Sequence, residues 1–204
     1  MRQFIPTKSA LKRSKRLLDF SERGYKLLDR KKTVLMRELV LKTEAAKQAA
    51  DNLEQAMAEA REALRRANMT QGRADVEALA LAEPVETSLA LFYSSSMGVE
   101  MPYLKADFKP KEPRYGLYRS NLLFDVATER AMALREPLLR YIEAETACRR
   151  LAKAIAATTR RANSIEKIQI PRYTVEVKQI REALEEKDRE EQARVKVLKN
   201  HLDR

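Results

Sequence analysis

The chain has 204 residues, and its 41 lysines and arginines against 30 aspartates and glutamates give a formal net charge of +11. Charged residues make up 35% of the sequence, and glycine occurs only four times. This composition is typical of long helices and coiled coils and excludes most enzymes built on a sheet. The single cysteine, Cys148, excludes an internal disulfide and fits a reducing cytoplasm. The length allows one domain or two, and we expect a single elongated domain over residues 1–204.

The first segment, residues 7–70, is predicted to be one continuous helix. Pro6 and Thr7 provide the start signal, with Thr7 as the capping residue. A repeat of 3.5 residues held over this length predicts a left-handed coiled coil about 90 Å long, at about 1.5 Å per residue. The residues of this seam are Leu, Tyr or Ala, and the exceptions are Ser14, Ser21, Lys32 and Lys42. The seam positions are 11, 14, 18, 21, 25, 28, 32, 35, 39, 42, 46, 49, 53, 56, 60, 63 and 67.

The middle segment, residues 71–116, interrupts the helical pattern with three of the four glycines and four of the seven prolines. The alternation in VETSLALFY (85–93) predicts a strand. SSSMG (94–98) supplies turn residues, and VEMPYLKADF (99–108) is a candidate partner strand that Pro102 weakens. We therefore expect a small β-hairpin in this segment.

The last segment, about 119–204, returns to helical periodicity, although Pro137 and Pro171 fall within it. Two long helices separated by a compact insert bury their seams by folding back on each other. The predicted fold is therefore all-α, a long antiparallel two-helix coiled coil with a short β-hairpin insert between the helices. The second seam is predicted at Leu134, Leu138, Tyr141, Cys148, Ala152, Ile155, Ala162, Ile165, Val177, Ile180, Leu184, Val195, Leu198 and Leu202.

The sequence contains no catalytic constellation, so we expect a protein that is not itself an enzyme and uses no cofactor and no metal. The glycines are too far apart for the phosphate-binding pattern GxxxxGK[ST], and no Cys and His cluster offers metal ligands. His201 is predicted to be a solvated side chain, and Cys148 a small buried thiol. EEKDREEQAR (185–194) is typical of a solvated helix face.

Positive charge is concentrated in the first part of the chain. Residues 1–43 hold thirteen Lys or Arg against four Asp or Glu, whereas residues 158–204 hold twelve against nine. In an antiparallel pair the segment KSALKRSKR (8–16) lies beside the last helix, so we expect a partner that presents carboxylates there, with nucleic acid as the competitor. The candidate contact residues are Lys8, Lys12, Arg13, Arg160, Arg161 and Pro171. For Arg160 and Arg161, the alternative to a partner contact is a solvated flank of the coiled coil.

Three stretches, in order along the chain, resemble the D subunit of the V-type and A-type rotary ATPases: PTKSALKRSKR, TTRRANSIEKIQIPRY and EEKDREEQARVKVLKN. MPYLKADF in the middle segment also resembles the hairpin region of that family, so the likeness spans nearly the whole chain. The family commonly has Val-Asn-Ala-Leu-Glu where residues 162–166 are Ala-Asn-Ser-Ile-Glu. These substitutions are compatible with a helix seam.

The resemblance implies the central-stalk rotor of a motor that couples ATP hydrolysis or synthesis to proton or sodium transport through a membrane ring. The implied partners are the catalytic A and non-catalytic B subunits of the hexamer, the small F subunit, and the funnel-shaped C (or d) subunit on the ring. The implied location is cytoplasmic and peripheral to the membrane, with no direct insertion and no nucleic acid. Within this reading, we hypothesise that Pro171 bends the shaft locally; a tolerated kink satisfied by water is the alternative.

Two other classes of function stay open on the residues alone. One is a coiled-coil adaptor with no link to a motor, which should self-associate. The other is a basic helical hairpin that binds RNA, although only the first forty residues are basic enough, since acidic residues interleave elsewhere.

Overall fold

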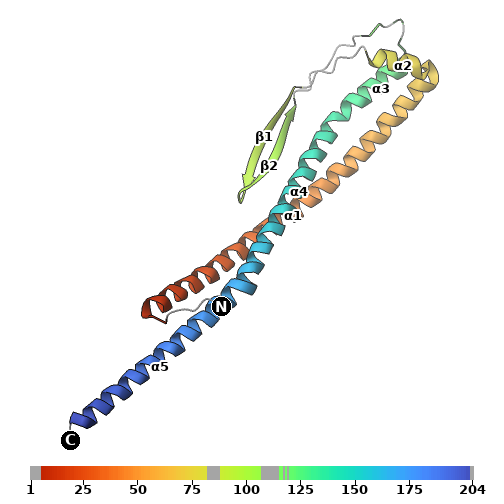
Figure 1. Ribbon diagram of the computed structural model, residues 1–204. Helices are drawn as coiled ribbons and strands as arrows, with labels where there is room; N and C mark the ends of the chain where they lie inside the picture. Colours follow the sequence, from red (N-terminus) through yellow and green to blue (C-terminus); the bar gives the residue numbers. More distant parts are fainter. Residues whose placement is uncertain (1–5, 82–87, 107–114, 117, 119, 203–204) are drawn as a thin grey trace. The chain divides into compact units, whose positions relative to one another are not determined.

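The computed structural model describes residues 6–81, 88–106, 115–116, 118 and 120–202 (Figure 1). Two helical stretches flank a two-stranded antiparallel sheet, which confirms the all-α class with a hairpin insert. The elements are, in order, α1 (Lys8–Gln71), α2 (Arg73–Ala80), β1 (Leu89–Ser96), β2 (Val99–Ala106), α3 (Leu122–Ala133), α4 (Arg135–Ser164), the π-helical turn η1 (Ile165–Gln169) and α5 (Ile170–Leu202).

Helix α1 begins at the predicted cap and is packed along the predicted seam. The Thr7 side chain accepts a hydrogen bond from the Ala10 N–H at 3.1 Å, which is the geometry of an N-cap. Every seam position of α1 is buried or half-buried except Lys42. All of the buried residues of this helix lie on the seam, namely Ser14, Ser21, Leu35, Leu53, Ala63 and Ala67.

The chain forms two compact units, of which the first consists of residues 1–34 and 155–204. Two side-chain contacts fix the direction of its helices. The Ser14 hydroxyl donates to Glu176 at 2.7 Å, and the Tyr25 hydroxyl donates to Glu166 at 3.2 Å. Because the later residue of α1 meets the earlier residue of the C-terminal stretch, the helices of this unit run antiparallel.

The second unit, residues 35–154, has its core where α1 gives way to α2 and α3. In Figure 1, α2 lies beside α3 at the end of α1. The rings of Tyr115 and Phe124 meet edge to face with centroids 4.9 Å apart. The Asn121 side chain caps α3 by accepting from the Phe124 N–H at 2.8 Å, and it also donates to Thr70. The buried cluster consists of Ala63, Ala67, Val76, Tyr115, Phe124 and Ala127.

The last helical segment contains two irregularities, each followed by a proline. Leu134 forms a turn between α3 and α4, and Pro137 lies in the first turn of α4. Pro171 lies in the first turn of α5, directly after the π-turn in which the Ile170 N–H bonds to the Ile165 carbonyl. Ser164 and Ile170 both have helical φ and ψ angles, so Pro171 lies within a continuous helical stretch, in which proline lacks the N–H that would bond to the preceding turn. The wider π-turn thus replaces the α-helical turn in which Pro171 would crowd a carbonyl.

The second seam differs from the predicted one in three places. Near the start of α4, Leu138 is exposed. In the middle of α4 the buried residues are Ala147 and Leu151, whereas Cys148 is half-buried and Ala152 is exposed. Toward the end of α5, Val195 and Leu198 are exposed. Ser14 lies opposite Glu176, and the helices are antiparallel, so the start of α1 lies opposite the part of α5 near residue 184. Beyond that point no described residue of α1 covers α5.

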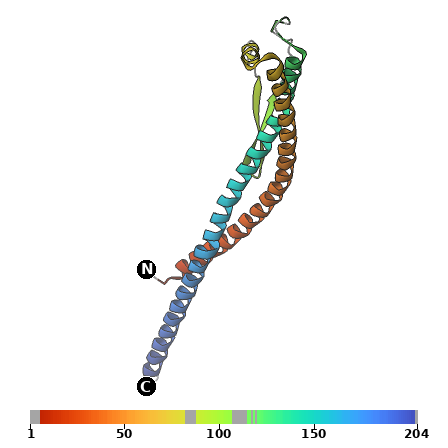
Figure 2. The same ribbon diagram turned by 90° about the vertical axis from the view of Figure 1, so that its right-hand side faces the viewer.

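The hairpin pairs β1 with β2 from Leu89↔Ala106 to Ser96↔Val99, and Figure 2 shows it beside the helices of its unit. Its turn is Met97–Gly98, with φ of 49° and 76°, a two-residue turn that matches the twist of the strands. The serines 94–96, expected in the turn, belong to β1. Residues 85–87 and 107–108 of the predicted strands lie outside the described residues.

Gly24 offers a test of the helix because a Cβ atom built on it meets no atom within 4 Å. Gly24→Ala should raise the free energy of unfolding by about 0.5–1 kcal/mol, since alanine loses less backbone entropy in a helix. Gly98→Ala is the matched control and should give no increase, because its positive φ disfavours a side chain. Urea denaturation followed by far-UV circular dichroism measures both; a lower midpoint for Gly24→Ala would contradict the expectation.

Candidate partner-binding surface

The net charge of the protein belongs entirely to one of its two units. Residues 1–34 and 155–204 contain 23 Lys or Arg against 12 Asp or Glu, a balance of +11. Residues 35–154 contain 18 of each, so the second unit is neutral. A surface that attracts an anionic partner at long range is therefore confined to the first unit.

The first turns of α1 carry what we call the N-terminal cationic face, made of Lys8, Lys12, Lys15 and Arg16. Steps of four and three residues bring these side chains to one side of a helix. All four are exposed, and with Leu11 and Asp19 they line an open hollow of about 400 Å³. The predicted contact residue Arg13 is exposed close by. Among the described residues, no carboxylate forms an ion pair with any of these five cations.

Arg160 and Arg161, near the end of α4, form a second group of exposed cations in the same unit. No described carboxylate pairs with either of them. The buried residues Thr158 and Ala162 flank them and hold this stretch of helix against its neighbour. Along the helix, Arg161 is fifteen residues before Glu176, which faces the start of α1. At about 1.5 Å per residue the two cationic groups are thus roughly 22 Å apart.

Several arginines of the second unit are, by contrast, paired with carboxylates of the same unit. Arg130 meets Glu59 at 3.0 Å, and pairs one helical turn apart join Arg140 to Glu136 and Arg149 to Glu145. Such exposed pairs contribute little stability. They neutralise the surface locally, and because the second unit holds equal numbers of the two charges, the net positive charge lies on the first unit.

The π-turn lies between the second cationic group and Pro171, and a polar contact fastens it to α1. Glu166, within the turn, accepts the hydrogen bond from the Tyr25 hydroxyl. That hydrogen bond, followed by the negative charge of Glu166 itself, raises the pKa of Tyr25. Pro171 is exposed, as is Ile168 in the turn. The predicted site residues therefore all lie in the first unit, but the structure separates Lys8, Lys12 and Arg13 from Arg160 and Arg161.

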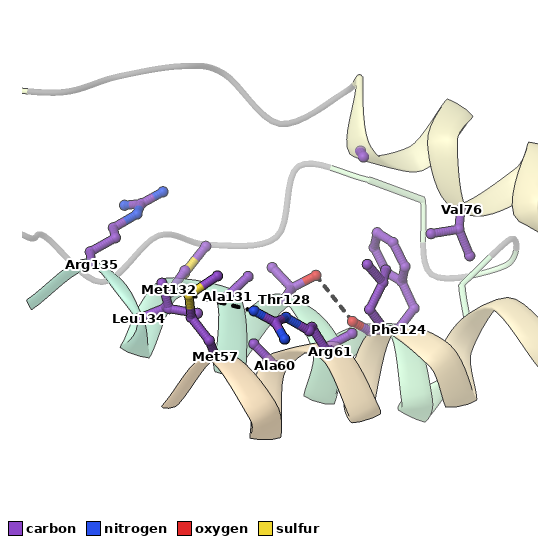
Figure 3. A pocket seen from close by; sticks show the side chains of 13 residues that line it. Met57, Ala60, Arg61, Val76, Phe124, Thr128, Ala131, Met132, Leu134 and Arg135 are labelled. Carbon is purple, nitrogen blue, oxygen red and sulfur yellow. Dashed lines mark hydrogen bonds between the residues drawn. The ribbon is translucent and has the colours of Figure 1, made fainter. Parts of the chain in front are cut away.

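Sequence reasoning missed an apolar pocket of about 480 Å³ in the second unit. Its lining includes Met57 and Ala60 of α1 together with Phe124 and Met132 of α3, and Figure 3 shows the Phe124 ring on the side of Val76 of α2. Arg61 lies at this pocket with its guanidinium 3.9 Å from the Met57 sulfur. The available signal was the alanine-rich half of the seam, because small side chains leave space where helices diverge.

Neither metal-binding nor membrane-spanning features occur in the part of the chain that the structure describes. No group of three or more His, Cys, Asp or Glu residues there could hold a metal ion. None of the described helices combines the length and hydropathy needed to cross a bilayer.

Comparisons with known proteins agree over nearly the whole length. Residues 10–200 match the family model of the ATP synthase D subunit. The D subunit of the V-type ATP synthase of Thermotoga neapolitana is 35% identical over 199 residues, which cover 98% of each chain. The D subunit of the A-type ATP synthase of Pyrococcus furiosus is 32% identical, and that of Thermococcus sibiricus 33% identical, each over 97% of this chain and 94% of the relative.

A testable prediction concerns Glu62 of the second unit, whose carboxylate accepts hydrogen bonds from Arg65 and Arg66 at 2.9–3.0 Å. These hydrogen bonds lower the pKa of Glu62 from 4.5 to about 2. Because the folded-state pKa is the lower one, the stabilisation is present above pH 4.5 and is lost as the pH falls toward 2. A carbon-13 NMR titration of the Glu62 carboxyl should give a midpoint near 2. Replacing both arginines by glutamine should move it back toward 4.5; an unchanged midpoint would contradict this account.

Proposed function

Since this chain belongs to the family of ATP synthase D subunits, we propose that it is the central-stalk shaft of a V/A-type rotary ATPase. In this role it couples ATP hydrolysis or synthesis in a catalytic hexamer to proton or sodium transport through a membrane ring. It carries out no chemistry itself and transmits rotation. The proposed location is the cytoplasmic side of the membrane, peripheral to it through the complex.

The observation that carries this proposal is the concentration of the net charge, +11, in the unit that holds both chain ends. We propose that this unit enters the hexamer of A and B subunits and faces carboxylates that line its cavity. Exposed ion pairs contribute only about 0–1 kcal/mol each. Contacts of this kind can therefore exchange partners during rotation without a large barrier at any position.

The far end of α5 supports the same role. Val195, Val197 and Leu198 are exposed there, beyond the stretch of α5 that α1 covers. A single helix with exposed apolar side chains and alternating charges suits an environment in which another protein surrounds it. We propose that this end turns within the hexamer, whereas the second unit contacts the small F subunit and the funnel-shaped C (or d) subunit.

The first test is to purify the chain, tagged at its natural locus, and to identify its partners by mass spectrometry. The A, B and F subunits should be recovered in fixed ratio. Recovery of RNA would favour the nucleic-acid alternative, and self-association alone would favour the adaptor alternative. Arg160→Gln with Arg161→Gln should weaken association with the hexamer about fivefold, at about 0.5 kcal/mol for each contact.

The matched control for this charge change is Arg65→Gln with Arg66→Gln, which removes two charges from the neutral unit. Its association with the hexamer should stay equal to that of the original chain at every salt concentration. The original chain should bind more weakly as salt rises, and the Arg160 and Arg161 variant should show a smaller salt dependence. Equal binding by both double variants would contradict the proposed cationic contact.

A mechanical role for Pro171 is the second part of the proposal. The π-turn followed by Pro171 interrupts the regular helix close to Arg160 and Arg161. We propose that this irregularity gives the shaft the local bend through which it acts on one catalytic interface at a time.

Pro171→Ala restores an N–H group and should make the helix more regular, which should lower the number of ions moved per ATP hydrolysed. Pro137→Ala is the matched control, because Pro137 also lies in the first turn of a helix but belongs to the second unit. Coupling is measured in reconstituted vesicles. If both variants couple as well as the original complex, the mechanical role is lost and Pro171 is a tolerated irregularity.

A further inference from the structure

The two edges of the β-hairpin differ in how their backbone groups are satisfied. On β2 the outward groups are closed by side chains of α4. Glu143 accepts a hydrogen bond from the Leu104 N–H, and Arg150 donates to the Glu100 carbonyl at 3.0 Å. The outward position between them is Pro102, which has no N–H. This edge of the hairpin therefore leaves little for another strand to pair with.

The register identifies the outward backbone groups of β1. A two-residue turn makes Ser96 and Val99 a hydrogen-bonded pair, and the pairing then alternates along the strands. The inward groups of β1 thus belong to residues 90, 92, 94 and 96. The outward N–H and C=O groups belong to Leu89, Leu91, Tyr93 and Ser95, and none of these groups bonds to another described residue.

Strand β1 also lacks the features that normally protect an edge. Residues 87–99 form an uncharged run in a chain of which 35% is charged, whereas β2 carries Glu100, Pro102 and Lys105. Seven of the eight residues of β1 are exposed. Leu89, Leu91 and Tyr93 are 50–55% exposed and share one face of the hairpin. A long, uncharged, exposed edge is the feature that natural sheets use to pair with another strand.

We propose that β1 accepts an extended, uncharged segment of a partner polypeptide as a third, hydrogen-bonded strand. The main-chain groups of such a segment complement the outward N–H and C=O groups of β1. Its apolar side chains would cover Leu89 and Leu91. A charged side chain at those positions would be desolvated without a counter-ion, because this strand offers none. The proposal goes beyond the proposed function, which names partners but assigns no surface of the hairpin to any of them.

A second copy of this chain is a poorer match for the same edge. Antiparallel pairing of two β1 strands centred on Tyr93 places Leu91 of each strand opposite Ser95 of the other, and leucine opposite serine gains less than an apolar cross-strand pair. Pairing centred on Leu91 places leucine opposite leucine, but it engages only residues 89–93 of each β1. A partner segment with apolar residues opposite both leucines can pair along the whole strand and therefore fits better.

Hydrogen–deuterium exchange at single-residue resolution tests the proposal on the tagged chain, purified with its partners from its own cells and compared with the isolated chain. The amides of Leu89, Leu91, Tyr93 and Ser95 should exchange about tenfold more slowly in the complex. The amides of residues 90, 92, 94 and 96 are bonded within the hairpin in both samples, so they should change less. Unchanged exchange at the outward amides, or a chain that holds no partner, overturns the proposal.

A pair of variants separates backbone pairing from side-chain contact. Leu91→Pro removes one outward N–H at a position that the hairpin tolerates, as Pro102 shows on the neighbouring strand. Leu91→Thr shortens the side chain but keeps the N–H. The protection at residues 89, 93 and 95 should be lost in Leu91→Pro and kept in Leu91→Thr.

Retained protection of the inward amides shows that the hairpin of Leu91→Pro is intact. If both variants keep the full protection, strand pairing is excluded. Protection in the isolated chain that grows with concentration, together with a dimeric mass, identifies a second copy as the occupant and overturns the proposal of a partner segment. Partners other than ATPase subunits, with protected outward amides, support this inference while rejecting the proposed function.

Discussion

Close packing along a narrow seam is the constraint on which the rest of this structure depends. The seam of α1 ends in alanines such as Ala63 and Ala67, which are buried but remove little apolar area from water. A helix that gains so little per turn needs many turns, and α1 accordingly runs for 64 residues. Where α2 and α3 meet its end, the described residues form a wider core with aromatic side chains.

The narrow buried seam also determines where the charged side chains of this protein lie. With little interior available, most charged side chains remain at the surface, where they either pair with a neighbour one turn away or stay unpaired. The second unit is neutral because it holds equal numbers of the two charges, some of which form pairs such as Arg149 with Glu145. The first unit lacks enough carboxylates for its cations, so its surface attracts anionic groups. Exposed charges act at long range and hold weakly, which suits the proposed contact with a surface past which the unit rotates.

In the C-terminal helical stretch, the buried seam continues on both sides of the π-turn that interrupts the regular helix. Val177 and Ile180 are buried beyond the π-turn, as Ala162 is before it. A π-turn adds a residue to one turn of the helix, so it changes which residues face the partner helix farther along. Tyr25 bonds to Glu166 within the turn. The break is therefore joined to α1 by a hydrogen bond, although no residue of the turn is buried.

The sequence by itself determined the seam of α1, the Thr7 cap, the hairpin and the family, because each of these is written in local periodicity or in motifs. It did not identify that the seam in α4 lies one residue earlier than predicted, at Ala147 instead of Cys148. Adjacent small residues give no periodic signal. The tertiary structure alone decided that α5 outruns the described part of α1, that an apolar pocket opens beside Ala60, and which hairpin edge Glu143 and Arg150 close. Each of these depends on which residues, far apart in the chain, are brought within contact, and that is fixed only when helices and strands pack together.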